Sequence, residues 1–289
     1  MKNNSPIFAK PPSDNISLED CKFYHVMDIP GLSEPTKGEW DLRKGVDEYL
    51  GHVDFKNKTV LELGPASGFQ TFHIEKMGGD VTSIELDYKK YGMDIVPNVK
   101  HNWQKGAGEG IGRSHYLFEH GKVKNAYWYT HKAFNSKSKL ILSHVNDLPE
   151  EIGIYDISLM SSVILHLQNP ILGIQNMLRH TKEKAIITDM GSYKRIKSFR
   201  DIKRNLKQLI SPRLPTIEFY PKVPKVNNKY HDIMTWWKIS PEFIINVASI
   251  SGFETNSTNY HIQYNNGYPM DMFTVVCERT VPIENCNYD

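Results

Sequence analysis

The stretch 59–69 constrains the fold of this chain more than any other, because it predicts a buried strand that runs directly into a glycine turn. The apolar run at 60–63 has the length and composition of a central strand. Gly64 and Gly68 follow it and supply a backbone that can turn sharply and lie close to a ligand before a helix begins. A strand, a tight turn and a helix in this order are typical of α/β folds with a parallel sheet.

A second apolar run, Val81–Glu85, gives the spacing of a nucleotide-binding unit. A helix over 69–76 would join the two runs, and Gly78 and Gly79 would end that helix. Glu85 closes the second run roughly 20 residues after the glycine turn, the offset at which dinucleotide-type folds place the acid that binds a ribose. Glu85 is therefore the candidate ribose ligand.

The charge at the end of the first strand indicates what the ligand is. A dinucleotide site needs three glycines in the pattern G-x-G-x-x-G, but here Ala66 takes the middle place and Phe69 the last. Glu62 would repel a pyrophosphate and would suit a ligand that carries an ammonium and a sulfonium group. S-adenosylmethionine is such a ligand. The alternative, a turn that binds nothing, leaves acids unused at two strand ends, which is costly.

Composition places the chain among ordinary globular proteins. Hydrophobic residues make up 39% and charged residues 24%, and no apolar run approaches the roughly 20 residues of a membrane-spanning helix. The first residues lead into no apolar signal core, and Cys21, Cys277 and Cys286 lack the spacing of metal ligands. We expect a cytoplasmic protein with free thiols, no metal and no membrane partner.

The chain divides into residues 1–50, an N-terminal arm and cap, and residues 51–289, one α/β domain. The segment 23–43 interleaves aromatic residues with histidine, aspartate and arginine, and a helix is expected through Val46 and Tyr49. This segment would either cap the cofactor or pack against the edge of the sheet.

The rest of the pattern predicts a Rossmann-like sheet, mostly parallel, with helices on both faces and an antiparallel strand pair at the C-terminus. Residues 87–123 show no clear period and suggest a surface excursion, with a mobile glycine-rich loop at 106–112. Strands are predicted at 139–143, 154–160, 184–190, 259–264 and 272–279. Helices are predicted at 125–134, after Pro170, and from Ser240, Pro241 and Glu242 to about 251.

Polar residues follow the later strands at the edge where open α/β sheets bind ligands. Asn146 and Asp147 come after the strand at 139–143 and would bond the adenine edge or, alternatively, cap their own loop. Ser161 and Ser162 follow the next strand, and Asp189 stands near the end of the strand after that. These positions converge on one edge of the sheet.

Together these pieces resemble the class I S-adenosylmethionine-dependent methyltransferases over about 58–279. The likeness rests on 62–68, Ile84-Glu85, 155–157 and the closing segments 252–253 and 273–276. Within the class, Tyr24-His25, the segment 38–43 and the segment 165–170 are similar to the branch that contains the tRNA wobble-uridine modifying enzymes.

The resemblance implies a set of cofactor contacts. The turn would wrap the methionine portion, Glu85 with its neighbour Leu86 would hold the ribose, Val145 and Asn146 would flank the adenine, and Ser161 and Ser162 would lie beside the cofactor. The residues of that turn are Gly64, Pro65, Ala66, Ser67 and Gly68, with Glu62 before them. Ala66 departs from the commonest pattern, which has glycine there, so the path of the turn does not follow from the resemblance.

Methyl transfer needs alignment of the acceptor and, for a hydroxyl or a protonated amine, a base. His166 is the histidine nearest the expected site, although a histidine at the start of an apolar helix is commonly structural. His25, Tyr24 and Asp189 are further candidates. For the tryptophans, Trp40 included, packing in a core or lid is the simpler interpretation.

A basic stretch within 191–238 suggests a lid-like insertion and leaves the acceptor open. Its basic residues between Ser192 and Lys225 are Lys194, Arg195, Lys197, Arg200, Lys203, Arg204, Lys207, Arg213, Lys222 and Lys225. We expect a methyltransferase for a small molecule such as a sugar, whose lid would attract an anionic acceptor. The alternatives are a tRNA-modifying enzyme, because such a stretch would suit phosphates, and a non-catalytic cofactor-binding protein. The sequence does not indicate an oligomeric state.

Overall fold

The computed structural model describes most of the chain. The described residues are 8–92, 94, 113–191, 214–221, 234–286 and 288, and the side chains of 113–118 are excepted. The expected glycine-rich loop at 106–112 and the ten basic residues named between Ser192 and Lys225 lie outside the described residues.

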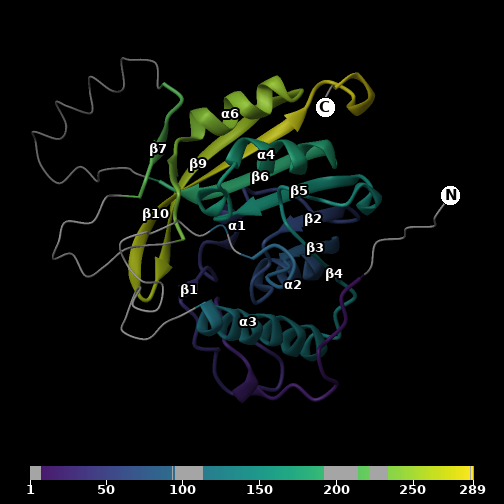
Figure 1. The fold of residues 1–289 in the computed structure, drawn as a ribbon, viewed down its shortest axis with the longest axis vertical. Coiled ribbons are helices and arrows are strands. Elements are labelled where there is room, and N and C mark those ends of the chain that lie inside the picture. Colours follow the sequence, from purple (N-terminus) through teal and green to yellow (C-terminus); the bar gives the residue numbers. More distant parts are fainter. Residues whose placement is uncertain are drawn as a thin grey trace, which may run out of the picture.

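One eight-stranded mixed sheet forms the centre of the molecule, in the order β1-β9-β10-β6-β5-β2-β3-β4 (Figure 1). Its strands are β1 (Trp40–Asp41), β2 (Thr59–Leu63), β3 (Asp80–Leu86), β4 (Lys139–Ser143), β5 (Tyr155–Ser161), β6 (Thr181–Met190), β9 (Phe253–Asn265) and β10 (Tyr268–Arg279). The run from β4 to β6 is parallel, whereas β10 pairs antiparallel with both β6 and β9. This confirms the predicted fold: a Rossmann-like, mostly parallel α/β sheet with an antiparallel pair at its C-terminal end.

Helices cover both faces of the sheet, as predicted (Figure 1). They are α1 (Val46–Tyr49), α2 (Phe69–Lys76), α3 (Arg113–Ala133), α4 (Pro170–Arg179) and α6 (Pro241–Ile250), with the 3-10 turns η1 (Leu18–Asp20), η3 (Glu150–Ile152), η4 (Ile164–His166) and η5 (Ile283–Asn285). In Figure 1 α4 and α6 lie on one side of the sheet, and α2 and α3 lie on the other. A small second sheet pairs β7 (Ile217–Phe219) with β8 (Trp237–Ile239).

The starts of α4 and α6 follow from local chemistry. Asn169 caps α4 by accepting a hydrogen bond from the Leu172 amide at 3.1 Å, and Pro170 opens the first turn. The Ser240 hydroxyl accepts from the Phe243 amide at 3.3 Å in the same way. Both starts were predicted from the sequence and are confirmed.

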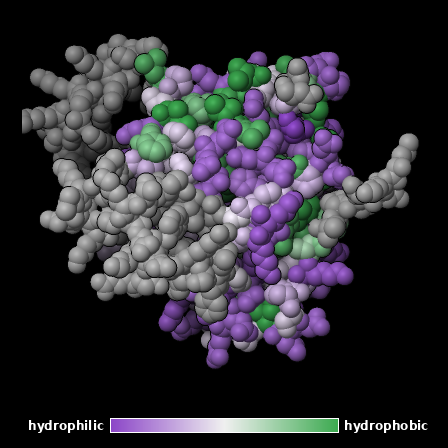
Figure 2. Space-filling view, viewed as in Figure 1, coloured by the Kyte–Doolittle hydropathy of each residue, from purple (hydrophilic) through white to green (hydrophobic). Residues whose placement is uncertain are grey.

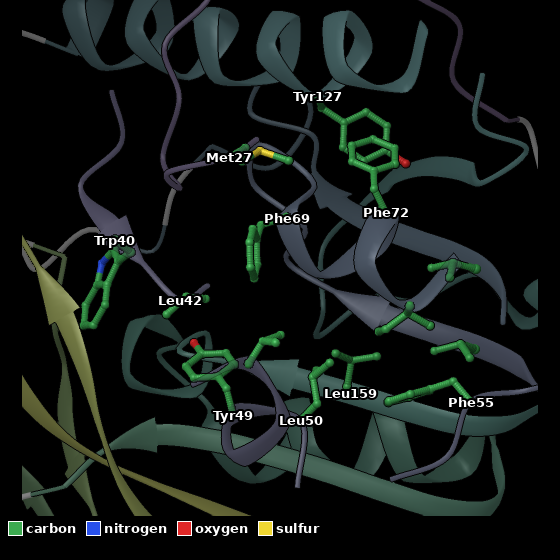
Figure 3. Close-up of a cluster of buried hydrophobic side chains, with 14 of the residues drawn as sticks. Met27, Trp40, Leu42, Tyr49, Leu50, Phe55, Phe69, Phe72, Tyr127 and Leu159 are labelled. Carbon is green, nitrogen blue, oxygen red and sulfur yellow. The ribbon is translucent and has the colours of Figure 1, made fainter. Parts of the chain in front are cut away.

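Side chains alternate along each central strand and so build two apolar cores. Val60 packs in a core with α1, α2, α3 and the N-terminal segment, while Leu61 and Leu63 pack on the other face with α4 and α6. Figure 3 shows the first core, in which Phe72 and Tyr127 lie together with ring centroids 5.3 Å apart. The two cores hold the parallel strands between them, so that the carboxyl ends of these strands lie at the same edge of the sheet.

Several elements extend beyond their predicted bounds. Helix α3 begins at Arg113, inside the excursion predicted at 87–123, and runs to Ala133. On this helix, Glu119 contacts Lys22 and His120 contacts Tyr88. Because these inward-facing positions are polar, the first half of the helix lacks the apolar period from which a helix is predicted. The closing strands are also longer than predicted, because pairing continues along 253–279 around the turn at Asn266 and Gly267.

The molecular surface in Figure 2 is uneven in hydropathy. Apolar residues gather in the upper part of the view, where α4 and α6 lie, and Ile171 and Ile250 are among the exposed apolar side chains of these helices. Within the described part of the chain, no helix combines the length and the hydrophobicity needed to cross a bilayer.

Candidate functional site

A cavity of about 520 Å³ opens at the carboxyl ends of β2, β3, β4 and β5, the edge at which open α/β sheets bind ligands. Its walls come from these strand ends, the N-terminal segment, α3 and the loop around η4. The lining residues are Lys22, Tyr24, His25, Glu39, Trp40, Tyr49, Gly64, Ala66, Gln70, Ile84, Glu85, Leu86, Tyr88, Asp94, Glu119, His120, Val123, Ser143, His144, Val145, Ser161, Ser162, Val163, His166, Leu167 and Met234. This size suits a small-molecule ligand.

The glycine turn has a left-handed backbone at three alternate positions. Gly64, Ala66 and Gly68 have φ values of 83°, 50° and 87°. A Cβ atom at Gly64 would lie 2.5 Å from the Val163 side chain, so this position requires glycine. Ala66 takes the left-handed conformation in spite of its methyl group, so the turn follows a path that a glycine at this position would also allow.

Glu85 ties the turn to the end of β3. Its carboxylate accepts hydrogen bonds from the Ala66 amide at 3.2 Å and from the Leu86 amide at 2.7 Å. The side chain is buried yet lines the cavity, and burial raises its pKa. A carboxylate held at this place can accept hydrogen bonds from a pair of ligand hydroxyls.

Glu62, in contrast, does not line the cavity. It lies on the α2 face of the strand, where its Oε2 accepts hydrogen bonds from the Thr71 hydroxyl and, at 2.8 Å, from the Ser83 hydroxyl. Oε1 has no hydrogen-bond partner among the described residues. Burial raises the pKa of Glu62 to about 7. The Glu62 carboxylate, which was expected to face a positively charged ligand, therefore points into the protein interior beneath the turn.

The other predicted cofactor residues divide between the wall and the layer behind it. On the wall, with Glu85, are Gly64, Ala66, Leu86, Val145, Ser161 and Ser162. Behind it, with Glu62, are Pro65, Ser67, Gly68 and Asn146. Ser67 acts from behind by fixing the N-terminal segment, because its hydroxyl accepts from the His25 amide at 3.1 Å.

The predicted catalytic residues also differ in whether they line the cavity. His166 lines the cavity, and its Nδ1 lies 2.7 Å from the Met234 carbonyl oxygen. A neutral ring that donates from Nδ1 has its lone pair on Nε2, which is the form of a general base. His25 lines the cavity too, but burial lowers its pKa to about 3. Asp189 is buried outside the wall and accepts from the Met190 amide at 2.6 Å.

Several wall residues have no counterpart in the sequence-based prediction. Tyr88 stacks on His120 with ring centroids 4.4 Å apart, and its hydroxyl lies 3.0 Å from His120 Nδ1. The Tyr49 hydroxyl lies 3.4 Å from the Ser162 hydroxyl. Gln70 accepts from the Ser161 hydroxyl at 2.8 Å. Tyr88 follows the end of β3 by two residues, and this position could have marked it as a residue of the site. The others reach the cavity only through tertiary packing.

The wall contains more acidic than basic side chains. Its carboxylates belong to Glu39, Glu85, Asp94 and Glu119, and Lys22 is its one lysine or arginine among the described residues. Lys22 lies 2.9 Å from Glu119 and 3.9 Å from Glu39. In the part of the chain that the structure describes, no group of three metal-binding side chains comes together.

Comparisons with known proteins assign this chain to no family. No family model matches the chain, and no curated protein matches it. Solved structures of similar fold include a 1,6-didemethyltoxoflavin N1-methyltransferase from Burkholderia thailandensis, at 9% identity and TM-score 0.49, over 83% of this chain and 78% of that one.

Two further structures are similar to the same degree. A magnesium protoporphyrin IX methyltransferase from Synechocystis has 11% identity and TM-score 0.45, over 83% and 82% of the two chains. An S-adenosylmethionine-dependent methyltransferase from Methanosarcina mazei has 11% identity and TM-score 0.46, over 80% and 96%. At these identities and TM-scores the likeness carries no argument about the family, the reaction or the acceptor of this chain.

Proposed function

We propose that the protein is an S-adenosylmethionine-dependent methyltransferase that acts on a small molecule. The observation that carries the proposal is the position of Glu85, a buried carboxylate on the cavity wall beside the left-handed turn at Gly64 and Ala66. This pairing offers a hydroxyl-binding carboxylate and a closely approachable backbone at one end of a cavity of ligand size.

The wall residues suit the parts of this cofactor. Glu85 would bind the ribose hydroxyls, with Leu86 and Val145 beside the nucleoside, and the turn would enclose the methionine portion. Ser161 and Ser162 would lie near the reacting end of the cofactor. Glu62, Pro65, Ser67, Gly68 and Asn146 would support these contacts from behind the wall.

The protein's part in the reaction is alignment and proton removal. When bound, the cofactor would supply a methyl group on a positively charged sulfur; the acceptor's lone pair would take this group and the C–S bonding electrons would return to sulfur. His166 would take the proton that a hydroxyl or ammonium acceptor must lose, since Nδ1 donation to Met234 leaves the lone pair on Nε2. His25 and Asp189 are weaker candidates, because His25 has a pKa of about 3 and Asp189 lies outside the wall.

In this proposal, residues 1–50 form an N-terminal arm and cap, and residues 51–289 form the methyltransferase domain with a lid-like insertion at about 191–238. The capping role is supported by Lys22, Tyr24, Glu39 and Tyr49, which all line the cavity. A cytoplasmic location belongs to the same proposal.

Transfer to a tRNA wobble uridine and cofactor binding without catalysis are the two alternatives. The first is less well supported, because the described wall holds four carboxylates and a single lysine, a poor match for a polyphosphate. Cofactor binding without catalysis would give His166, which lines the cavity, no role in proton removal. Bulk tRNA that neither binds nor accepts a labelled methyl group would eliminate the RNA alternative.

Calorimetry with S-adenosylhomocysteine tests the proposal. The wild-type protein should bind it, and Glu85→Ala should weaken binding by about 10- to 100-fold, the loss of one or two charge-assisted hydrogen bonds. Glu254→Gln, on an exposed position of β9, is the matched control and should bind as the wild type does. Absence of binding to the wild type, or equal affinity of Glu85→Ala, contradicts the proposal.

A further inference from the structure

The part of the cavity formed by the N-terminal segment and α1 combines aromatic rings with a carboxylate. Tyr24, Trp40 and Tyr49 line this part, and Glu39 stands among them at its rim with 44% of its side chain exposed. All four belong to the N-terminal segment and α1. They therefore come from a different part of the chain than the strand ends that would hold the cofactor.

Backbone pairing brings these side chains together. The amides of Glu39 and Trp40 both donate to the Tyr24 carbonyl oxygen at 3.0 Å, and a parallel bridge joins His25 to Trp40. The carboxylate of Glu39 lies near enough to Tyr24 to contribute to raising the pKa of its phenol, which reaches about 12 chiefly through burial. The Tyr49 hydroxyl is directed toward Ser162, so this end adjoins the reacting end of the cofactor site.

Among the described residues that line this end, carboxylates outnumber lysines and arginines. Lys22 lies between Glu119 at 2.9 Å and Glu39 at 3.9 Å, so one positive charge faces two carboxylates. Burial lowers the pKa of His25 to about 3 and of His120 to about 4, so both rings are neutral at pH 7. These carboxylates would repel a carboxylate or a phosphate, whereas a cation would be attracted by them and could also contact the aromatic side chains.

We propose that the acceptor is a small molecule that carries an amine, and that Glu39 with Tyr24, Trp40 and Tyr49 selects it as the ammonium. This inference rests on the proposed methyltransferase function. The bound ammonium gives one proton to His166, its freed lone pair forms the N–C bond, the C–S electrons return to sulfur, and the proton passes from His166 to water. Glu39 is thus a specificity-determining residue rather than a catalytic one.

The test measures binding of three matched probes to protein saturated with S-adenosylhomocysteine. The probes are 2-phenylethylamine, 2-phenylethanol and phenylacetate, which share a ring and differ in charge. We expect the amine to bind at least about tenfold more tightly than the alcohol, and the carboxylate most weakly. In Glu39→Gln the preference for the amine should fall several-fold, while S-adenosylhomocysteine affinity stays the same.

Glu34→Gln is the control, since Glu34 is an exposed carboxylate on the same segment and does not line the cavity. It should keep the full preference. Equal binding of the three probes, tighter binding of phenylacetate, or no binding at millimolar concentration overturns the inference while leaving the proposed function intact. Failure of the wild type to bind S-adenosylhomocysteine is the separate result that overturns the function itself.

Discussion

At the scale of single residues, two carboxylates at neighbouring strand ends have different surroundings. Glu85 lies on the cavity wall and holds the Ala66 amide, while Glu62 lies beneath the turn and holds the hydroxyls of Thr71 and Ser83. Because side chains alternate along a strand, the neighbours of Glu62 face α4 and α6, and Glu62 itself must face α2. Glu62 therefore supports the turn, and Glu85 is available to a ligand.

Burial of Glu62 predicts a pH-dependent stability. Its folded pKa of about 7 exceeds the ordinary value of 4.5, so the native state holds the extra proton between these values. This contribution is complete below about pH 4.5 and is lost as the pH rises through about 7, at about 1.4 kcal/mol per pH unit at most. Relative to wild type, Glu62→Gln should thus gain stability as the pH rises.

Urea unfolding of both proteins at about pH 5 and about pH 8 measures this difference. Glu254→Gln on exposed β9 serves as the control and should show a constant offset from wild type. A constant offset for Glu62→Gln as well would show that Glu62 does not change its protonation in this range.

Replacement of His166 tests its role in proton removal. His166→Ala should lower kcat by about 100-fold or more if the acceptor must lose a proton, because a positioned base contributes on the order of 10²–10⁴. Affinity for S-adenosylhomocysteine should stay within a few-fold of wild type. Recovery of the rate at higher pH would support the role, and full turnover at neutral pH would remove His166 from the mechanism.

At the scale of elements, the N-terminal segment depends on a close backbone approach. Residues 38–41 run beside 24–26, with the Val26 amide donating to the Trp40 carbonyl at 2.7 Å. A Cβ atom at Gly38 would lie 2.1 Å from the backbone carbonyl carbon of His25. The segment that supplies Tyr24 and Glu39 to the cavity therefore requires glycine at this position.

Gly38→Ala should separate the two stretches. We expect a loss of stability of about 1–3 kcal/mol, as for other overpacked sites, together with weaker binding of the amine probe. Thermal unfolding and probe calorimetry measure the two effects. Gly121→Ala is the matched control, because nothing lies within 4 Å of the added methyl group and alanine favours the helix α3. Wild-type behaviour of Gly38→Ala would contradict this packing.

The elements that the sequence predicts well are those whose signals are local. The caps at Asn169 and Ser240 place α4 and α6, and an apolar run with its glycine turn places β2. The start of α3 was missed, because Glu119 and His120 on that helix bind residues from other parts of the chain and interrupt the apolar period. Local pattern is thus sufficient where packing is apolar and insufficient where polar partners are distant.

At the scale of the whole molecule, the contrast between local patterns and distant contacts also explains which residues of the candidate site could be predicted. The strand-end residues follow from the parallel topology, which the sequence predicts, so Glu85, Ser161 and Ser162 could be named in advance. The opposite wall is assembled from the N-terminal segment and α3, and no local pattern announces that Tyr49 meets Ser162 or that His120 meets Tyr88. These contacts across the cavity could therefore be recognised only in the folded structure.

The central claim is that the cavity at the strand ends binds S-adenosylmethionine through Glu85 and the glycine turn. A crystal structure of the protein with S-adenosylhomocysteine tests it most directly. We predict the ribose hydroxyls within hydrogen-bond distance of the Glu85 carboxylate and the homocysteine against Gly64 and Ala66, at about 2.5–3.0 Å for the O–H···O contacts. Density for the ligand at another place, or Glu85 without a contact to it, would contradict the claim.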